Sequence, residues 1–283
     1  MWLGSPSNPS SGRDEGSHGP IGLLRLGLLD MEEGLRGWRI WHLIGISTIR
    51  RRYSRSRLGQ VWLTLSTGIF VLLYGMLFSL LFKQEPAELL PYITVSFILW
   101  SVIASSISNA TVCLVGAHQY FQNQYASFSI AIFVVIYREL ITLGHEIMIV
   151  LAVLVYYGLF SNIDFIGLLI GLVFVTFTLT WVCYAIAIIC VRYRDVIQIM
   201  LSVMRAAFFL TPVFWRESML PVEQQKYLIL NPFNVLLAVV RDPLLGIKTP
   251  DHYLLYGAIA SVLGFIFTMM FVGKYRRRII FWI

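Results

Sequence analysis

Acidic and histidine side chains that could move protons are concentrated in one apolar run. Arg138, Glu139, His145 and Glu146 all lie within residues 128–160, which are otherwise mostly apolar. Ionisable groups at membrane depth are typical of proton relays, but the same groups also form hydrogen-bonded contacts between neighbouring helices. Glu139 and Glu146 are seven residues apart, so they share one helical face. Because no other apolar run supplies a matching acid, the pattern favours a structural network over a relay.

A second group with chemical potential is the arginine cluster within residues 50–57, which precedes a long apolar run. Its members are Arg50, Arg51, Arg52, Arg55 and Arg57. The guanidinium group pairs phosphate oxygens in a bidentate manner, so the cluster could attract a phosphate-bearing molecule. Positive charges beside an apolar run also set membrane topology. The two interpretations are compatible.

Several other chemistries are excluded by missing patterns. The three cysteines, Cys113, Cys183 and Cys190, lie in apolar runs and have no metal-ligand spacing. The chain lacks a Gly-x-x-x-x-Gly-Lys-[Ser/Thr] phosphate loop, so it cannot cradle ATP in that way. It also lacks a Ser–His–acid signature and paired external carboxylates. We therefore predict a chain that is not an enzyme and that holds neither metal nor cofactor.

Composition places the chain in a membrane. Of its 283 residues, 58% are hydrophobic and 13% are charged, whereas a soluble domain carries about 25% charged residues. Long uncharged runs favour helices over the alternating strands of a β-barrel. The net charge of +7 does not indicate nucleic acid as a partner, because the basic residues flank apolar segments and no soluble domain presents them.

The apolar runs predict an all-α membrane protein with six transmembrane helices. The expected spans are residues 61–82, a helix within 89–117, a helix within 128–160, and residues 165–191, 196–215 and 253–273. Basic residues gather before the first span, between the fourth and fifth, and after the sixth. Positive charge marks the cytoplasmic side, so we expect both termini to be cytoplasmic.

Four regions follow from this topology. Residues 1–34 are expected to be an irregular cytoplasmic tail, since the first 20 are rich in Ser, Gly and Pro and lack the apolar core of a signal peptide. Residues 35–60 are expected to be an amphipathic interface helix with a basic segment, or alternatively a helix packed on protein. Residues 61–273 form the six-span domain, and residues 274–283 form a cytoplasmic tail.

A short apolar run interrupts the segment between the fifth and sixth spans. Residues 227–240 number only 14, whereas a helix needs about 20 residues to cross the hydrocarbon core. Irregular backbone at membrane depth is stable only where protein or a water-filled cavity covers it. We therefore expect residues 216–250 to contain an external re-entrant segment.

Two sequence blocks resemble a known family. The first is residues 52–62 (RYSRSRLGQVW), leading into a span with Tyr74, Phe78 and Phe82. The second comprises residues 192–195 (RYRD), 209–215 (FLTPVFW), 231–233 (NPF) and 241–246 (RDPLLG). Both are similar to the permease subunit of type-2 ABC exporters of bacterial surface polysaccharides, which export O-antigen, capsule or teichoic acid. The resemblance covers about residue 35 to the carboxyl terminus.

The resemblance implies how the chain would assemble and work. It implies a homodimer in the bacterial inner membrane, joined to two separate ATPase subunits that bind ATP and Mg²⁺. The substrate would be a lipid-linked polysaccharide. Arg55 and Arg57, nearest the mouth of the first span, would attract its pyrophosphate. Aromatic residues between spans two and three would dock on the ATPase, namely Tyr120, Phe121 and Tyr125.

The resemblance also assigns a pathway. Spans one, two and five would line the channel, and the residues that we expect to face it are Tyr74, Trp100, Arg205, Phe208 and Phe209. The residues expected to form an external gate are Pro212, Trp215, Asn231, Pro232 and Phe233, although the same segment could be a plug with a packing role only. Alternatives are an ABC permease for a smaller lipid-linked oligosaccharide or drug, and an ion-coupled secondary transporter using Glu139, His145 and Glu146. A membrane-embedded glycolipid enzyme is disfavoured because acids do not cluster at an interface.

Overall fold

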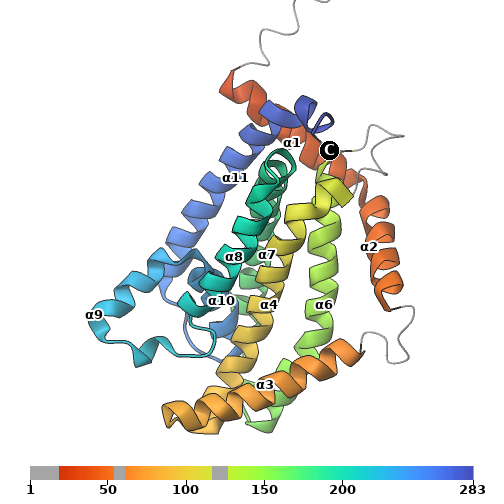
Figure 1. The fold of residues 1–283 in the computed structure, drawn as a ribbon. Coiled ribbons are helices and arrows are strands. Elements are labelled where there is room, and N and C mark those ends of the chain that lie inside the picture. The colour runs from red at the N-terminus through yellow and green to blue at the C-terminus, as the bar shows by residue number, and fades with distance from the viewer. Residues whose placement is uncertain (1–18, 54–60, 117–126, 283) are drawn as a thin grey trace, which may run out of the picture.

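The computed structural model describes residues 19–53, 61–116 and 127–282, and every regular element within those ranges is a helix (Figure 1). Five helices are long and apolar enough to cross a membrane, the pattern of a multi-pass membrane protein. They are α3 (Val61–Phe82), α4 (Pro86–Gly116), α6 (Ser129–Tyr156), α7 (Phe165–Arg192) and α11 (Asp251–Ile279). Each overlaps a span expected from the sequence.

The remaining elements are shorter. They are α1 (Pro20–Arg36), α2 (Trp38–Tyr53), α8 (Asp195–Leu210), α9 (Val222–Gln225) and α10 (Pro232–Leu244), with the 3₁₀ turns η2 (Phe160–Asn162), η3 (Glu217–Met219) and η4 (Lys226–Leu230). Figure 1 shows α1 lying across one end of the bundle, together with the end of α11. We call this the α1 end, and we call the end where α4 and α7 begin the opposite end.

The expected fifth span is shorter than predicted, so the six-span topology is not confirmed. α8 has 16 residues and is about 24 Å long at 1.5 Å per residue, less than the hydrocarbon core of about 30 Å. The helix stops because Thr211 turns to extended backbone, and its hydroxyl and amide both donate to the carbonyl of Ala207 (2.7 and 2.9 Å). Pro212 follows and cannot continue the hydrogen-bonded ladder.

The core of the bundle lies along α4. More than half of the residues in its most apolar stretch are buried, against less than a third in each of the other four long helices. α4 packs against α3, α6, α7, α8 and α10. The short helix α10 inserts among α4, α7 and α11, and its residues from Asn234 to Leu244 are all buried. Protein therefore covers the later part of the run 227–240 that was expected to re-enter the membrane, whereas Tyr227 and Leu230 at its start are exposed. The structure does not confirm that the run is re-entrant.

The helix α1 corrects the expectation that residues 20–34 are irregular. Pro20 starts the helix at a position where its missing N–H costs nothing. Two glycines then let α1 and α11 touch backbone to backbone. A side chain at Gly27 would overlap the carbonyl of Met269, and one at Gly273 would overlap the carbonyl of Leu23. Local composition could not predict this helix, because its packing partner lies at the far end of the chain.

A buried carboxylate fixes α1 to three other helices. Asp30 on α1 is fully buried. It accepts hydrogen bonds from the Tyr184 hydroxyl of α7 (2.5 Å) and from the Ser129 backbone N–H of α6 (3.2 Å). It also forms an ion pair with Arg276 of α11 (3.2 Å). Arg276 lies in the stretch 274–283 expected to be a cytoplasmic tail, but α11 continues as a helix to Ile279.

The expected interface helix 35–60 is divided at Gly37 into α1 and α2. α2 lies along α6 (Figure 1). Gly45 faces the Tyr137 ring, and the indole of Trp41 packs edge-on against the same ring with 5.3 Å between centroids. The structure thus supports the alternative of a helix packed on protein. The next helix, α3, crosses the opposite end of the bundle obliquely (Figure 1).

The contact between α1 and α11 leads to a first prediction. In Gly27→Ala the new methyl group overlaps the Met269 carbonyl, so α1 must move away from α11. The general helix preference for Ala over Gly, about 1 kcal/mol, is outweighed by overpacking of about 1–3 kcal/mol. We expect a lower melting temperature of the purified protein in detergent. Gly144→Ala is the matched control, since nothing lies within 4 Å of its added methyl group. Equal melting temperatures for the two variants would refute the backbone contact.

Candidate functional site

An aromatic cluster centres on Phe214, in the extended segment after α8. Its ring lies 4.8 Å from Phe78, 5.2 Å from Phe208, 5.6 Å from Tyr74 and 6.0 Å from Phe97, measured between centroids. These partners belong to α3, α4 and α8. The cluster therefore packs the extended segment against three helices at the opposite half of the bundle.

One side of the aromatic cluster is a ladder on α3. Phe70, Tyr74, Phe78 and Phe82 recur every four residues and share one helical face. Successive ring centroids are 4.1, 6.2 and 5.5 Å apart, and each pair is stacked. Tyr74 and Phe82 are partly solvent-exposed. The ladder thus offers a row of ring faces at the border between the bundle and its surroundings.

The other side joins α4, α8 and α10. Trp100 lies 5.8 Å from Phe208 and 5.5 Å from Phe233 between centroids, and Phe208 lies 5.3 Å from Phe209. The structure therefore brings together all four aromatic residues expected at a channel. Their exposure differs: Trp100 is 5% exposed and belongs to the core, whereas Phe209 is 75% exposed. Their role as channel lining stays a prediction.

Arg205, the fifth residue expected at the channel, lies on the exposed side of α8. Its Nε donates to the carbonyl of Leu201 (3.2 Å) and its Nη2 to the hydroxyl of Ser202 (3.4 Å). Both partners belong to its own helix. No ion pair involves Arg205 among the residues that the structure describes.

The expected gate residues lie at a point where the chain closes on itself. The Asn231 amide donates to the carbonyl of Leu210 (3.2 Å) and the hydroxyl of Thr211 (3.0 Å), and its oxygen caps α10 by accepting from the Phe233 N–H (3.0 Å). Residues 212–230 therefore leave and return at one place; we call them the closed loop. Pro232 occupies the first turn of α10, where its fixed φ suits a helix.

The closed loop is also held by groups near its start. Trp215 donates its indole N–H to the carbonyl of Phe209 (3.4 Å). Pro212 is buried, and its carbonyl accepts from the Tyr92 hydroxyl (3.2 Å) and from Arg241 (3.3 Å). The five gate residues are thus drawn together around the end of α8 and the start of α10. Whether they open and close stays a prediction.

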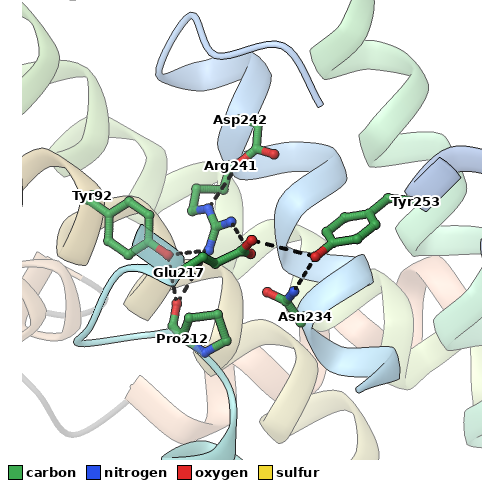
Figure 2. A network of polar contacts seen from close by, with 7 residues as sticks. All are labelled: Tyr92, Pro212, Glu217, Asn234, Arg241, Asp242 and Tyr253. Atoms are coloured by element: carbon green, nitrogen blue, oxygen red, sulfur yellow. Dashed lines mark hydrogen bonds and ion pairs between the residues drawn. The ribbon is translucent and has the colours of Figure 1, made fainter. Parts of the chain in front are cut away.

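Arg241 forms the densest polar network of the opposite end (Figure 2). Arg241 is 3% exposed, and its guanidinium lies over the Tyr92 ring, 4.6 Å from the centroid. It donates to the Tyr92 hydroxyl (2.7 Å) and pairs with Asp242 (3.1 Å) and, at longer range, Glu217 (3.4 Å). The network connects α4, η3 and α10 through one side chain.

An outer arm extends the Arg241 network to α11 (Figure 2). The Tyr253 hydroxyl donates to Glu217 (3.5 Å) and accepts from the Asn234 amide (3.2 Å). These contacts are longer than those of Tyr92 with Arg241. The Arg241 network therefore holds the closed loop at two points, Pro212 and Glu217.

Burial and charge act in opposite directions on the pKa values of this network. Burial raises the pKa of Asp242 above its usual value, although the adjacent Arg241 cation lowers it. Burial alone would lower the pKa of Arg241, but the acidic groups of Tyr92, Asp242 and Glu217 raise it. The guanidinium is therefore charged at all physiological pH values, and the arrangement depends on that charge.

The glutamates of α6 form the structural network that the sequence favoured. Both are buried. Glu146 interacts with the hydroxyls of Thr67 on α3 and Ser101 on α4, each at 3.2 Å. Glu139 interacts with the Ser105 hydroxyl (2.5 Å) and the Asn109 amide (2.9 Å) of α4. The nearby His145 ring bonds the Ile141 carbonyl of its own helix (2.8 Å).

Some expected functional residues lie outside the described residues. They are Arg55 and Arg57 of the basic segment and Tyr120, Phe121 and Tyr125 of the expected ATPase contact. Within the described ranges, no group of three or more His, Cys, Asp and Glu side chains is placed to hold a metal ion.

Sequence reasoning missed three residues that organise the site. Phe214 was quoted within a motif but not identified as the centre of the aromatic cluster. Tyr92 and Glu217, the partners of Arg241, gave no signal, because they lie far from it in the sequence. The four-residue spacing of the α3 ladder was the one available signal for the aromatic side.

Comparison with known proteins adds no family. A scan against protein-family models matches none of them, and a search of curated proteins finds no significant match.

The Arg241 network gives a second prediction. Arg241→Leu leaves the Asp242 and Glu217 carboxylates near each other without their cation, which costs about 3–5 kcal/mol for a buried pair. We expect a large fall in melting temperature and faster proteolysis within the closed loop. Lys248→Gln, which removes an exposed pair with Asp251, should change neither. Without Arg241 the pKa of Asp242 rises further, because the cation that lowers it is gone. The folded variant therefore takes up a proton more readily than the unfolded chain. Its loss of melting temperature relative to the wild type should shrink as the pH falls. A defect that grows on acidification would contradict this account.

Proposed function

We propose that this chain is the transmembrane subunit of an ATP-driven exporter that moves a lipid-linked polysaccharide across a bacterial inner membrane. The observation that carries the proposal is a polar face on α8 in a bundle whose other outward faces are mostly apolar. Arg194, Gln198, Ser202 and Arg205 lie at spacings of four, four and three residues and are all exposed. We call these four residues the polar stripe.

The polar stripe cannot face lipid without cost. An arginine near the centre of a membrane helix is unfavourable by about 2.5–3.5 kcal/mol on insertion scales unless it reaches water or a partner. A second copy of the chain, placed against α8 so that a water-filled space remains between the copies, removes that cost. The homodimer that the sequence resemblance implies is therefore the assembly that suits this face.

The aromatic cluster suits a sugar substrate. Tyr74 and Phe82 of the α3 ladder and Phe209 of α8 are at least partly exposed. Aromatic faces pack against the apolar C–H faces of sugar rings, whereas the sugar hydroxyls stay in water. A polar stripe next to exposed rings gives both kinds of contact. The closed loop, held at the end of α8, would then serve as the external gate.

The charge distribution supports the proposed orientation. Apart from the end of α2, where Arg50 and Arg51 lie, basic residues prevail at the α1 end and acidic residues are common at the opposite end. By the positive-inside rule this distribution favours a cytoplasmic α1 end. In this arrangement α8 and the extended segment after it would cross from the α1 end to the opposite end, and both termini would be cytoplasmic. The residues at the α1 end include Arg36, Arg192, Arg194, Lys274 and Arg277, and those at the opposite end include Glu88, Asp164, Glu217, Glu223 and Asp251.

Energy would come from outside the chain. The sequence has no phosphate loop, so two partner ATPase subunits would bind ATP and Mg²⁺ and dock on the segment with Tyr120, Phe121 and Tyr125. The same assembly suits a smaller lipid-linked oligosaccharide or drug. Arg55 and Arg57 would attract the phosphate of either substrate.

Reconstitution tests the proposal. The chain should purify from its native membrane as a dimer in complex with two copies of an ATPase. ATP turnover in proteoliposomes should require both subunits, and cells that lack the chain should retain finished polymer in the cytoplasm. A monomeric chain that transports substrate without ATP would refute the proposal.

The buried glutamates discriminate the ion-coupled alternative. In Glu146→Gln an amide replaces the carboxyl group, and it can still contact the Thr67 and Ser101 hydroxyls. If Glu146 is structural, export and melting temperature should stay close to those of the wild type. A secondary transporter that uses Glu146 to carry protons would lose coupling completely. Glu146→Leu, which cannot form either hydrogen bond, provides the matched control for the structural contribution.

A further inference from the structure

The polar stripe of α8 has an uneven charge. Arg194 and Arg205 carry positive charge on the same face, 11 residues apart, or about 16 Å along a helix. Gln198 and Ser202 lie between them and are neutral. Asp195 is the acidic residue of the first turn, close to Arg194. Beyond this first turn, Arg205 is the one charged residue of α8.

Arg205 has spare hydrogen-bonding capacity. A guanidinium group carries five N–H donors, and Arg205 bonds one carbonyl and one hydroxyl of its own helix. The elements packed against α8 are α4 and α7. Glu88 is the one Asp or Glu residue in these two helices, and it pairs with Arg216. The charge of Arg205 is therefore not neutralised by any described residue.

Arg205 differs from Arg241 in its burial and in its partners. Arg241 is buried and is surrounded by Asp242, Glu217 and Tyr92, as expected of a structural arginine. Arg205 is exposed, and the exposed ring of Phe209 follows it one turn later on the same side of α8. A charged group without a partner on an apolar helix marks a place where a ligand of opposite charge supplies the missing contact.

We infer that Arg205 binds an anionic group, such as a phosphate or carboxylate carried by the transported molecule, and that it makes the α8 face selective for anions. This inference rests on the proposed function, because it takes the α8 face to line the transport pathway. Rings of arginine from several subunits select anions in pores, and a second copy of the chain would supply a second Arg205. Phe209, at the next position on the same face, would contact the apolar part of the same ligand.

Charge-dependent labelling of a cysteine tests the inference without a transport assay. The full chain, with Cys113, Cys183 and Cys190 replaced by Ala, receives Ser202→Cys and is reconstituted in phosphatidylcholine vesicles. The rates of modification by a negatively charged and a positively charged methanethiosulfonate of similar size are then compared. Arg205 should speed the anionic reagent relative to the cationic one by at least about threefold, since a unit charge one turn away acts in partly aqueous surroundings.

Matched variants separate charge from structure. Arg205→Gln in the Ser202→Cys chain should abolish the preference, and Arg205→Lys should retain it. Val203→Cys, on the neighbouring apolar face of α8, should react slowly with both reagents. If Ser202→Cys shows no preference with Arg205 intact, or reacts as slowly as Val203→Cys, the inference is overturned. The wild-type-arginine comparison decides the matter even if Arg205→Gln does not fold.

Two further arms identify the source of the anion. Soluble inorganic pyrophosphate should slow the anionic reagent if water-borne groups reach Arg205. Phosphatidylglycerol in the vesicles should slow it if lipid head groups reach the stripe from the bilayer. Slowing by neither would overturn a binding role for Arg205. Labelling needs no ATPase, so it can fail or succeed independently of export. An anion preference in a chain that does not export would refute the proposed function but leave the anion site intact. Export by a chain that shows no anion preference would refute the anion site but leave the proposed function intact.

Discussion

The buried guanidinium of Arg241 is the contact on which the opposite end of the molecule depends. A charge removed from water must be surrounded by partners, and these partners come from different parts of the chain: Tyr92 of α4, Pro212 after α8, Glu217 of η3 and Asp242 of α10 itself. The short helix α10 can remain inside the bundle because its polar side chains are paired there. The closed loop, in turn, has a fixed point from which it extends.

Each end of the bundle is held together by a buried charged side chain, but the charge has opposite sign at the two ends. At the α1 end, Asp30 is the buried charge and Arg276 its counter-ion, and glycines bring the helices α1 and α11 into backbone contact. At the opposite end the buried charge is a cation with acidic partners. Between the ends, Glu139 and Glu146 join α6 to α3 and α4 through hydroxyl and amide groups. Asp30, Arg241, Glu139 and Glu146 thus each connect the helix that carries them to other helices of this apolar bundle.

The sequence predicted those features that depend on local composition. Long apolar runs define α3, α4, α6, α7 and α11. An apolar segment in a membrane forms a helix because a helix satisfies its backbone hydrogen bonds internally. The early end of α8 was missed since hydropathy continues past Pro212, although backbone hydrogen bonding does not. The helix α1 was missed because Gly27 looks like a helix breaker until Met269 is placed beside it. In the site, the regular spacing on α3 was visible, but the meeting of Phe214 with that ladder and of Tyr92 with Arg241 required the tertiary fold.

The pairing of α1 with α11 also sets an order of events during synthesis. Gly27 and Asp30 cannot contact Met269 and Arg276 until these partners are synthesised, about 240 residues later. At a translation rate of roughly 5–20 residues per second, this delay is about 12–50 s. Until then the buried position of Asp30 cannot exist, and α1 has no groove in which to lie. The helix α1 can therefore dock only after α11 has been made, although it is itself made long before.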